Sequence, residues 1–136
     1  MQNIQIKETR SIPGEAILAL YRANHWSSAD KPEQLLPALA NSHRLISAWD
    51  GDQLVGLGNA ISDGHLVVYF PHLVVLPDYQ GRGIGRMIMD RMAVHYGDFH
   101  QQQLVADGGS VTFYEKCGFR RSGDTVPMWI YGGNEH

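Results

Sequence analysis

The chain has 136 residues, of which 43% are apolar and 18% are charged, so it can bury the core of one domain but is too short for two. Eleven Lys and Arg residues stand against fourteen Asp and Glu residues, and the net charge of −3 argues against a dedicated nucleic-acid binder. A single cysteine, no membrane-spanning apolar run and no signal-peptide core at the start favour a cytoplasmic protein without disulfides.

The first third of the chain predicts one strand and two helical segments. Apolar and polar residues alternate over 3–8, as in a strand, and residues 15–24 carry apolar side chains at helical spacing. A second helix is expected to begin near Asp30, which together with Glu33 resembles a capping box. Pro37 lies inside this helix and is expected to kink or split it, because proline has no N–H to donate.

The middle of the chain predicts three consecutive antiparallel strands, separated by the turn dipeptides Asp50-Gly51 and Asp63-Gly64. These strands are expected over residues 44–49, 53–61 and 65–75. Pro71 falls inside the third strand and cannot donate to a partner, so we expect a bulge or a splayed edge there.

The last third predicts two helices and three short strands. Helices are expected from Gly83 to Tyr96 and from Ser110 to Lys116, the second ended by Gly118. In the helix expected from Gly83, the residues that should face the core are Ile84, Met87, Ile88, Met92 and His95. Strands are expected over 103–106, 119–121 and 128–131, and the polar run 100–103 is expected to be a loop. The resulting order, β-α-α-β-β-β-α-β-α-β-β, describes an α/β domain with a mixed, mainly antiparallel sheet.

A strand, a glycine-rich loop and a helix follow one another from Leu73 to Arg86. The loop has glycine at every second position, namely Gly81, Gly83 and Gly85. Without side chains in the way, the N–H groups of this loop and the positive end of the helix dipole can bind a phosphate or pyrophosphate. Arg82 and Arg86 add positive charge at the rim. The alternative is that the glycines only make a tight turn.

The glycine spacing does not match the two commonest nucleotide-binding loops. A Rossmann G-x-G-x-x-G motif counted from Gly81 or Gly83 would need glycine where the chain has Arg86 or Ile88. The chain also has no G-x-x-x-x-G-K followed by Ser or Thr. Nicotinamide dinucleotides and nucleoside triphosphates are therefore weak candidates.

Two motifs resemble those of the GCN5-related N-acetyltransferase (GNAT) family. The acetyl-coenzyme A signature of that family is Q/R-x-x-G-x-G/A, and residues 80–85 read QGRGIG after a typical V-x-P-x-Y pattern at 75–79. Residues 113–119 read FYEKCGF, which is close to the family's F-Y-E-K-x-G-F. The predicted element order also resembles the family fold over nearly the whole chain. We therefore expect a single N-acetyltransferase domain over residues 1–136.

The resemblance implies transfer of an acetyl group from acetyl-coenzyme A to a primary amine, directly within a ternary complex and without a metal. The family's pyrophosphate-binding amides correspond here to Gln80, Gly81, Arg82, Gly83, Ile84, Gly85 and Arg86. Its pantetheine-binding strand corresponds to Leu73, Val74 and Val75. The expected acceptor is a small-molecule or peptide amine, with no nucleic-acid or membrane partner, and a homodimer is compatible with the sequence.

The catalytic residues are less well defined. Family members often use the tyrosine of the second motif, here Tyr114, to donate a proton to the departing thiolate, although Tyr114 can equally be a core residue. Relatives that place a carboxylate near residues 69–72 use it as the general base, and this chain has none there. His72, with a suitable ordinary pKa, and Asp107 are the candidates, and a structural role is open for both.

The sequence is compatible with several alternatives. The chain could be a coenzyme-binding module without efficient catalysis, since the usual carboxylate is absent. A tRNA-linked acetyltransferase toxin is a second alternative, which the negative net charge disfavours. Trp26 either lines an acceptor pocket or caps a loop. Cys117 is expected to be a small packed residue, and the histidines lack the spacing of a metal site.

Overall fold

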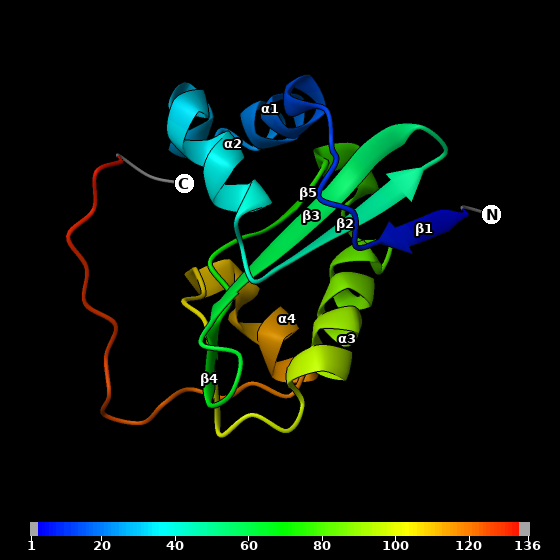
Figure 1. The fold of residues 1–136 in the computed structure, drawn as a ribbon. Coiled ribbons are helices and arrows are strands. Elements are labelled where there is room, and N and C mark those ends of the chain that lie inside the picture. The colour runs from blue at the N-terminus through cyan, green and yellow to red at the C-terminus, as the bar shows by residue number, and fades with distance from the viewer. Residues whose placement is uncertain (1–2, 134–136) are drawn as a thin grey trace.

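The computed structural model describes residues 3–133 as one mixed sheet with helices on both faces (Figure 1). The strands are β1 (Ile4–Lys7), β2 (Arg44–Asp50), β3 (Gln53–Ser62), β4 (Val67–Tyr69), β5 (Leu73–Val75) and β6 (Gln101–Gln103). Their order is β1-β2-β3-β4-β6, with β5 paired to β3 beside β4. The β4–β6 pair is parallel and the other pairs are antiparallel. The predicted α/β class with a mixed, mainly antiparallel sheet is confirmed.

Two pairs of helices cover the two faces of the sheet. The helices are α1 (Gly14–Ala23), α2 (Pro32–Ala40), α3 (Ile84–Tyr96) and α4 (Val111–Lys116), with short 3₁₀ turns η1 (Ser27–Asp30), η2 (Pro77–Tyr79) and η3 (Gly108–Ser110). α1 and α2 lie on one face, and α3 and α4 lie on the other (Figure 1). Successive residues of β2 therefore enter different cores: Leu45 packs with α1 and α2, and Ile46 packs with α3.

The strand predicted over 65–75 is divided by a bulge into β4 and β5. β4 pairs with residues 61–62 of β3, and β5 pairs with residues 56–58. Three residues, 70–72, consequently lie opposite two, 59–60. Pro71 sits in this bulge, where a missing N–H donor costs no ladder bond. The predicted irregularity at Pro71 is confirmed, although it separates two strands instead of interrupting one.

The start and the course of α2 differ from the prediction. Asp30 ends η1, Lys31 is the N-cap residue, and no side chain caps the helix, so the capping box with Glu33 is absent. Pro32 at the first helical position removes one N–H that a cap would have satisfied. The helix also continues through Pro37 without being split. The lost hydrogen bond concerns the carbonyl of exposed Glu33, which water can satisfy.

α3 buries one face against the sheet, largely as predicted. Its buried residues are Ile84, Ile88, Met89, Met92 and Tyr96. Met87 and His95, which were expected in the core, are only half-buried. Tyr96 takes the last core position, where its hydroxyl lies 2.6 Å from Nδ1 of His43. Gly58 of β3 allows the close approach of this helix, since a Cβ there would lie 2.8 Å from Cγ2 of Ile88.

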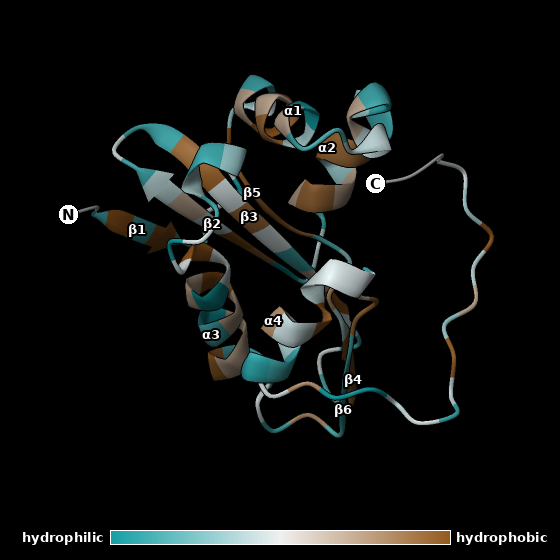
Figure 2. Ribbon diagram, turned by 180° about the vertical axis from the view of Figure 1, so that it is seen from behind, coloured by the Kyte–Doolittle hydropathy of each residue, from teal (hydrophilic) through white to brown (hydrophobic). Residues whose placement is uncertain are grey.

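The chain after α3 departs most from the prediction. β6 lies at 101–103 instead of 103–106, so the polar run predicted as a loop is a strand. An edge strand is held by main-chain pairing on one side and can carry polar side chains, which apolar patterning misses. Within residues 3–133, neither 119–121 nor 128–131 forms a strand. The segment 126–131 runs away from the sheet (Figure 2) and exposes Val126, Met128, Trp129, Ile130 and Tyr131.

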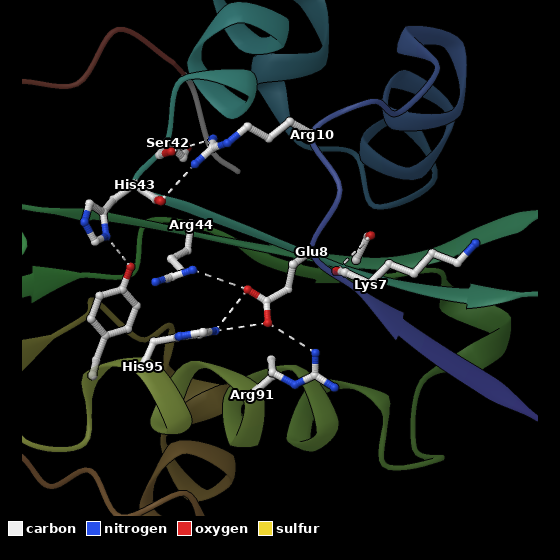
Figure 3. A network of polar contacts seen from close by, with 10 residues as sticks. Lys7, Glu8, Arg10, Ser42, His43, Arg44, Arg91 and His95 are labelled. Atoms are coloured by element: carbon white, nitrogen blue, oxygen red, sulfur yellow. Dashed lines mark hydrogen bonds and ion pairs between the residues drawn. The ribbon is translucent and has the colours of Figure 1, made fainter.

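The carboxylate of Glu8 joins the end of β1 to α3 and β2 (Figure 3). Nε2 of His95 and Nη1 of Arg91 lie 3.0 and 3.2 Å from Oε2 of Glu8, and Nη1 of Arg44 lies 3.6 Å from Oε1. Desolvation raises the pKa of Glu8, but the hydrogen bonds from His95 and Arg91 and the charges of His95 and Arg44 outweigh it. The pKa of Glu8 is therefore lowered from its ordinary value.

We expect Glu8→Gln to lower the free energy of unfolding at pH 7 by about 1 kcal/mol, as for a partly exposed ion-pair network. The pKa of Glu8 is lower in the folded state than in the unfolded state. The ion-pair network therefore stabilises the fold at pH values above the unfolded-state pKa, and this stabilisation is lost as the pH falls through the folded-state pKa. The difference from the unmodified protein should therefore shrink below about pH 4, measured by thermal unfolding as a function of pH. Glu15→Gln, which removes a solvent-exposed pair with Arg22, is the control and should change little. A pH-independent difference would contradict the assignment.

Candidate active site

The glycine loop joins β5 to α3 and presents its main chain to open space. Gly81 and Gly83 have φ angles of +78° and +84°, in the left-handed region that favours glycine. A Cβ added at either residue would meet no atom within 4 Å. Gly83 is the N-cap residue of α3, no side chain caps this end, and the first turn has no acidic residue. The first N–H groups of a 13-residue helix are thus available to an anion.

Two arginines lie at this loop, Arg82 within it and Arg86 in the first turn of α3, and each has a protein partner. The guanidinium of Arg82 lies 4.8 Å from the ring centroid of Tyr79. Nε of Arg86 donates to Oδ1 of Asp90 at 2.9 Å, one helical turn further on. Both arginine side chains are exposed. Both arginines place positive charge beside the loop, and Asp90 offsets part of that of Arg86.

A pair of side-chain amides braces the start of the loop. Nε2 of Gln80 donates to the carbonyl of Val75 at 3.0 Å and to Oδ1 of Asn24 at 3.1 Å. Nδ2 of Asn24 donates to the same Val75 carbonyl at 3.0 Å and to the carbonyl of Leu20 in α1. These bonds tie the end of α1 to the end of β5. Sequence analysis missed Asn24, since an asparagine after a helix carries no distinctive signal.

β5 offers main-chain groups along one edge. Main-chain groups of His72 and Leu76 bond to β3. Because alternate residues of a strand point the same way, the main-chain groups of Leu73 and Val75 point to the other edge. That edge has no strand partner within the described chain. The main chain of Val74 instead faces β3, and its side chain is buried in the core beneath α1 and α2.

The loop, β5 and α4 meet at Gly85. A Cβ there would lie 3.1 Å from Cζ of Phe113 and 3.7 Å from Cδ2 of Leu73. The structure therefore brings the two sequence motifs, which are separated by about thirty residues, into direct contact. Phe113 provides this contact, and Tyr114 is its neighbour on α4.

Tyr114 is half-buried at the edge of the core formed with α3. Its ring centroid lies 5.0 Å from that of Phe113 and 6.0 Å from that of Phe119. Burial raises the pKa of Tyr114 to about 12, and the charges of Cys117 and Asp107 add to this shift. The hydroxyl therefore stays protonated at neutral pH and can act as a proton donor. The side chain also borders a groove of about 540 Å³ along β6 and residues 104–106.

His72 ends the bulge and lies against α1. Its Nδ1 is 2.8 Å from the hydroxyl of Tyr21, and its ring centroid is 5.3 Å from that of half-buried Trp26. Tyr21 is fully buried, and this burial raises its pKa well above the ordinary value, so the phenol remains neutral. Asp107, the other base candidate, is exposed and precedes η3. His72 and Tyr114 thus belong to opposite faces of the sheet.

The remaining candidates have ordinary surroundings. Cys117 is a half-buried free thiol whose pKa is raised by burial, which does not favour a nucleophilic thiolate. Among the described residues, no three His, Cys, Asp or Glu side chains gather as a metal site requires. No helix in residues 3–133 has the length and apolarity to cross a bilayer. A groove of about 760 Å³ between α3 and residues 117–123 does not include the glycine loop.

Comparison with known proteins agrees with this geometry. The family model of the acetyltransferase (GNAT) domain matches residues 9–128. The chain belongs to the GNAT acetyltransferase family. A GNAT-family acetyltransferase from Streptococcus pneumoniae TIGR4 is 33% identical with a TM-score of 0.83, over 96% of this chain and 99% of that one. The resemblance predicted from the two motifs is confirmed.

Curated N-acetyltransferases are similar over a shorter range. An uncharacterized N-acetyltransferase of Gracilaria tenuistipitata var. liui is 35% identical over 75 residues, which are 54% of this chain and 41% of that protein. The GCN5-related N-acetyltransferase 3, chloroplastic, of Arabidopsis thaliana is 35% identical over 81 residues, 57% of this chain and 34% of that protein. These alignments cover less than half of each relative.

Proposed function

We propose that this GNAT domain transfers an acetyl group from acetyl-coenzyme A to a primary amine of a small molecule or peptide, directly within a ternary complex. The observation that supports this best is the loop at Gly81 and Gly83, which opens its main chain onto the uncapped start of α3. A pyrophosphate fits such a site, because no side chain lies near the glycines and the first turn of α3 has no acidic residue.

The coenzyme contacts can be assigned to particular groups. Main-chain N–H groups of residues 81–86 would hold the pyrophosphate, with Arg82 at the rim. The N–H of Gln80 already donates to the carbonyl of Pro77, so Gln80 would act through its side chain, which braces the loop. The open edge of β5 would hold the pantetheine arm through Leu73 and the N–H of Val75, since the Val75 carbonyl already accepts two hydrogen bonds. Val74 would contribute packing only. The bound coenzyme supplies the acetyl group as an activated thioester.

Two side chains are proposed to move protons. As the amine nitrogen attacks the carbonyl carbon, an N–C bond forms and the C–S bond breaks. Tyr114 would donate its proton to the departing sulfur. His72 would accept the proton of the amine in the tautomer whose Nδ1–H donates to the hydroxyl of Tyr21, since Nε2 then carries the accepting lone pair. Trp26, beside His72, would then line the acceptor pocket.

Coenzyme binding can be tested at Gly83. Coenzyme A should raise the melting temperature of the unmodified protein by mass action, and Gly83→Val should abolish that increase. Valine is strained at a φ of +84°, so the loop would rearrange. Gly64→Val is the matched control, because Gly64 has a φ of +83° in the β3–β4 turn. It should be destabilised similarly and keep the response to coenzyme. An undiminished response in Gly83→Val would reject the site.

Catalysis is tested with the same protein and a panel of primary amines. Release of free coenzyme thiol, together with acetylated amine in the mass spectrum, is expected for at least one class of acceptor. If the protein binds the coenzyme but acetylates no polyamine, amino acid, aminoglycoside or peptide, it is a coenzyme-binding module and not an acetyltransferase.

We also propose a homodimer. The support is the segment 126–131, whose five large apolar side chains are exposed in the single chain. Sedimentation equilibrium should give about twice the chain mass of 15.2 kDa, and Trp129→Ser should shift the equilibrium toward the monomer. A monomer at all concentrations would reject this proposal.

A further inference from the structure

Asn59 is a buried polar residue within the apolar run of β3. Its exposed fraction is 4%, and it lies opposite the bulge between β4 and β5. A buried amide is costly unless its donors and acceptor are all satisfied. Its partners therefore indicate what the residue does.

Asn59 bonds both main-chain groups of His72. The main-chain N–H of Asn59 donates to the carbonyl of His72 at 3.2 Å, and the N–H of His72 donates to Oδ1 of Asn59 at 3.1 Å. In a regular antiparallel pair, a main-chain carbonyl would receive that second bond. Because the bulge has three residues opposite two, the side-chain amide takes the place of the main-chain acceptor.

The other end of the Asn59 side chain is anchored at the end of α2. Nδ2 of Asn59 donates to Oγ of Ser42 at 3.0 Å, and Oγ of Ser42 donates to the carbonyl of Ala38 at 2.9 Å. Ser42 is also buried. The chain of donors runs in one direction, so the amide has one orientation: a reversed amide would set its NH₂ group against the N–H of His72.

We infer that Asn59 is a positioning residue. Its side chain closes the bulge and fixes the main chain of His72, so that the His72 ring lies against the hydroxyl of Tyr21. The inference rests on the proposed function, in which His72 accepts the proton of the amine. Asn59 holds the main chain of His72 from β3, and Tyr21 holds its ring from α1. Without the amide, the N–H of His72 loses this bond, and of the two bonds from Asn59 only the one to the carbonyl of His72 remains.

The test uses Asn59→Leu, which keeps the approximate size and removes both side-chain bonds. Ser42→Ala is a milder variant that removes only the anchor of the amide. Ser47→Ala is the matched control, since Ser47 is fully buried and hydrogen-bonded to Trp49 and Lys7, away from the bulge. For each variant we would measure hydrogen exchange of the residue 72 amide, kcat and KM for both substrates, and the thermal shift with coenzyme A.

In Asn59→Leu, exchange at residue 72 is expected to rise about tenfold relative to the change at core amides. Its kcat is expected to fall roughly 10- to 100-fold, as for a misplaced catalytic group, while the coenzyme response stays intact. Ser42→Ala should show smaller changes in the same direction, which keeps the test decisive if Asn59→Leu does not fold. Ser47→Ala should lose stability only.

The inference is overturned if Asn59→Leu, or Ser42→Ala in its place, behaves as Ser47→Ala does, with unchanged kcat and unchanged protection at residue 72. It is also overturned if kcat falls without a local change in exchange, because Asn59 would then act by another route. If the unmodified protein acetylates no amine, the proposed function is rejected, and with it the catalytic part of this inference. Exchange at residue 72 would still decide whether Asn59 closes the bulge.

Discussion

Replacing Tyr114 with phenylalanine is expected to lower kcat roughly 10- to 1,000-fold, in the range of general-acid losses. The substitution removes the hydroxyl and keeps the ring, so the contacts with Phe113 and Phe119 should survive. Coenzyme affinity should change little, because the proton is needed only as the C–S bond breaks. Steady-state rates and coenzyme thermal shifts measure the two effects separately.

The raised pKa of Tyr114, about 12, adds a second expectation. The donor stays protonated across the neutral and mildly basic range, so Tyr114 should contribute no basic limb to the pH–rate profile below about pH 10. Tyr96→Phe is the control: Tyr96 also has a raised pKa and a hydroxyl that contacts His43, but it lies at the far end of α3. It should cost about 1 kcal/mol of stability without lowering kcat. A fully active Tyr114→Phe would return Tyr114 to a packing role.

His72→Ala is expected to lower kcat/KM roughly 100- to 10,000-fold, the range of general acid–base contributions. A base works only when deprotonated, so kcat/KM of the unmodified enzyme should rise with pH as His72 loses its proton. That acid limb should disappear in His72→Ala. Asp107→Ala should keep it, since Asp107 is exposed on the loop before η3.

The same profile distinguishes a second mechanism. If the acid limb follows the pKa of the amine as the substrate is changed, the enzyme uses the deprotonated fraction of amine and water carries the proton away. His72 would then be a structural residue held by Tyr21 and Asn59. The contrast between His72→Ala and a change of substrate therefore decides between a side-chain base and none.

Local sequence determined the features that depend on local chain properties. Glycine at positions 81, 83 and 85 predicts a loop before a helix whose main chain no side chain obstructs, and the structure has positive φ angles at Gly81 and Gly83. Pro71 predicts a break in a strand, because proline has no N–H to donate to a neighbouring strand. Apolar spacing located α1 and most of α3 for the same reason: one buried face imposes its period on the sequence.

Only the tertiary structure decided the features that need a partner distant in the chain. The position of the edge strand, at 101–103 and not at 103–106, depends on its pairing with β4. Residues 128–131 have strand-like side chains but pair with no strand among the described residues. The one sequence signal for Asn59 is a polar residue in an apolar strand, which does not reveal its partner thirteen positions away. Asn24 and Tyr21 reach partners 51 positions away. Hydrogen bonds of this kind depend on how the elements pack together, and that packing leaves no period in the local sequence.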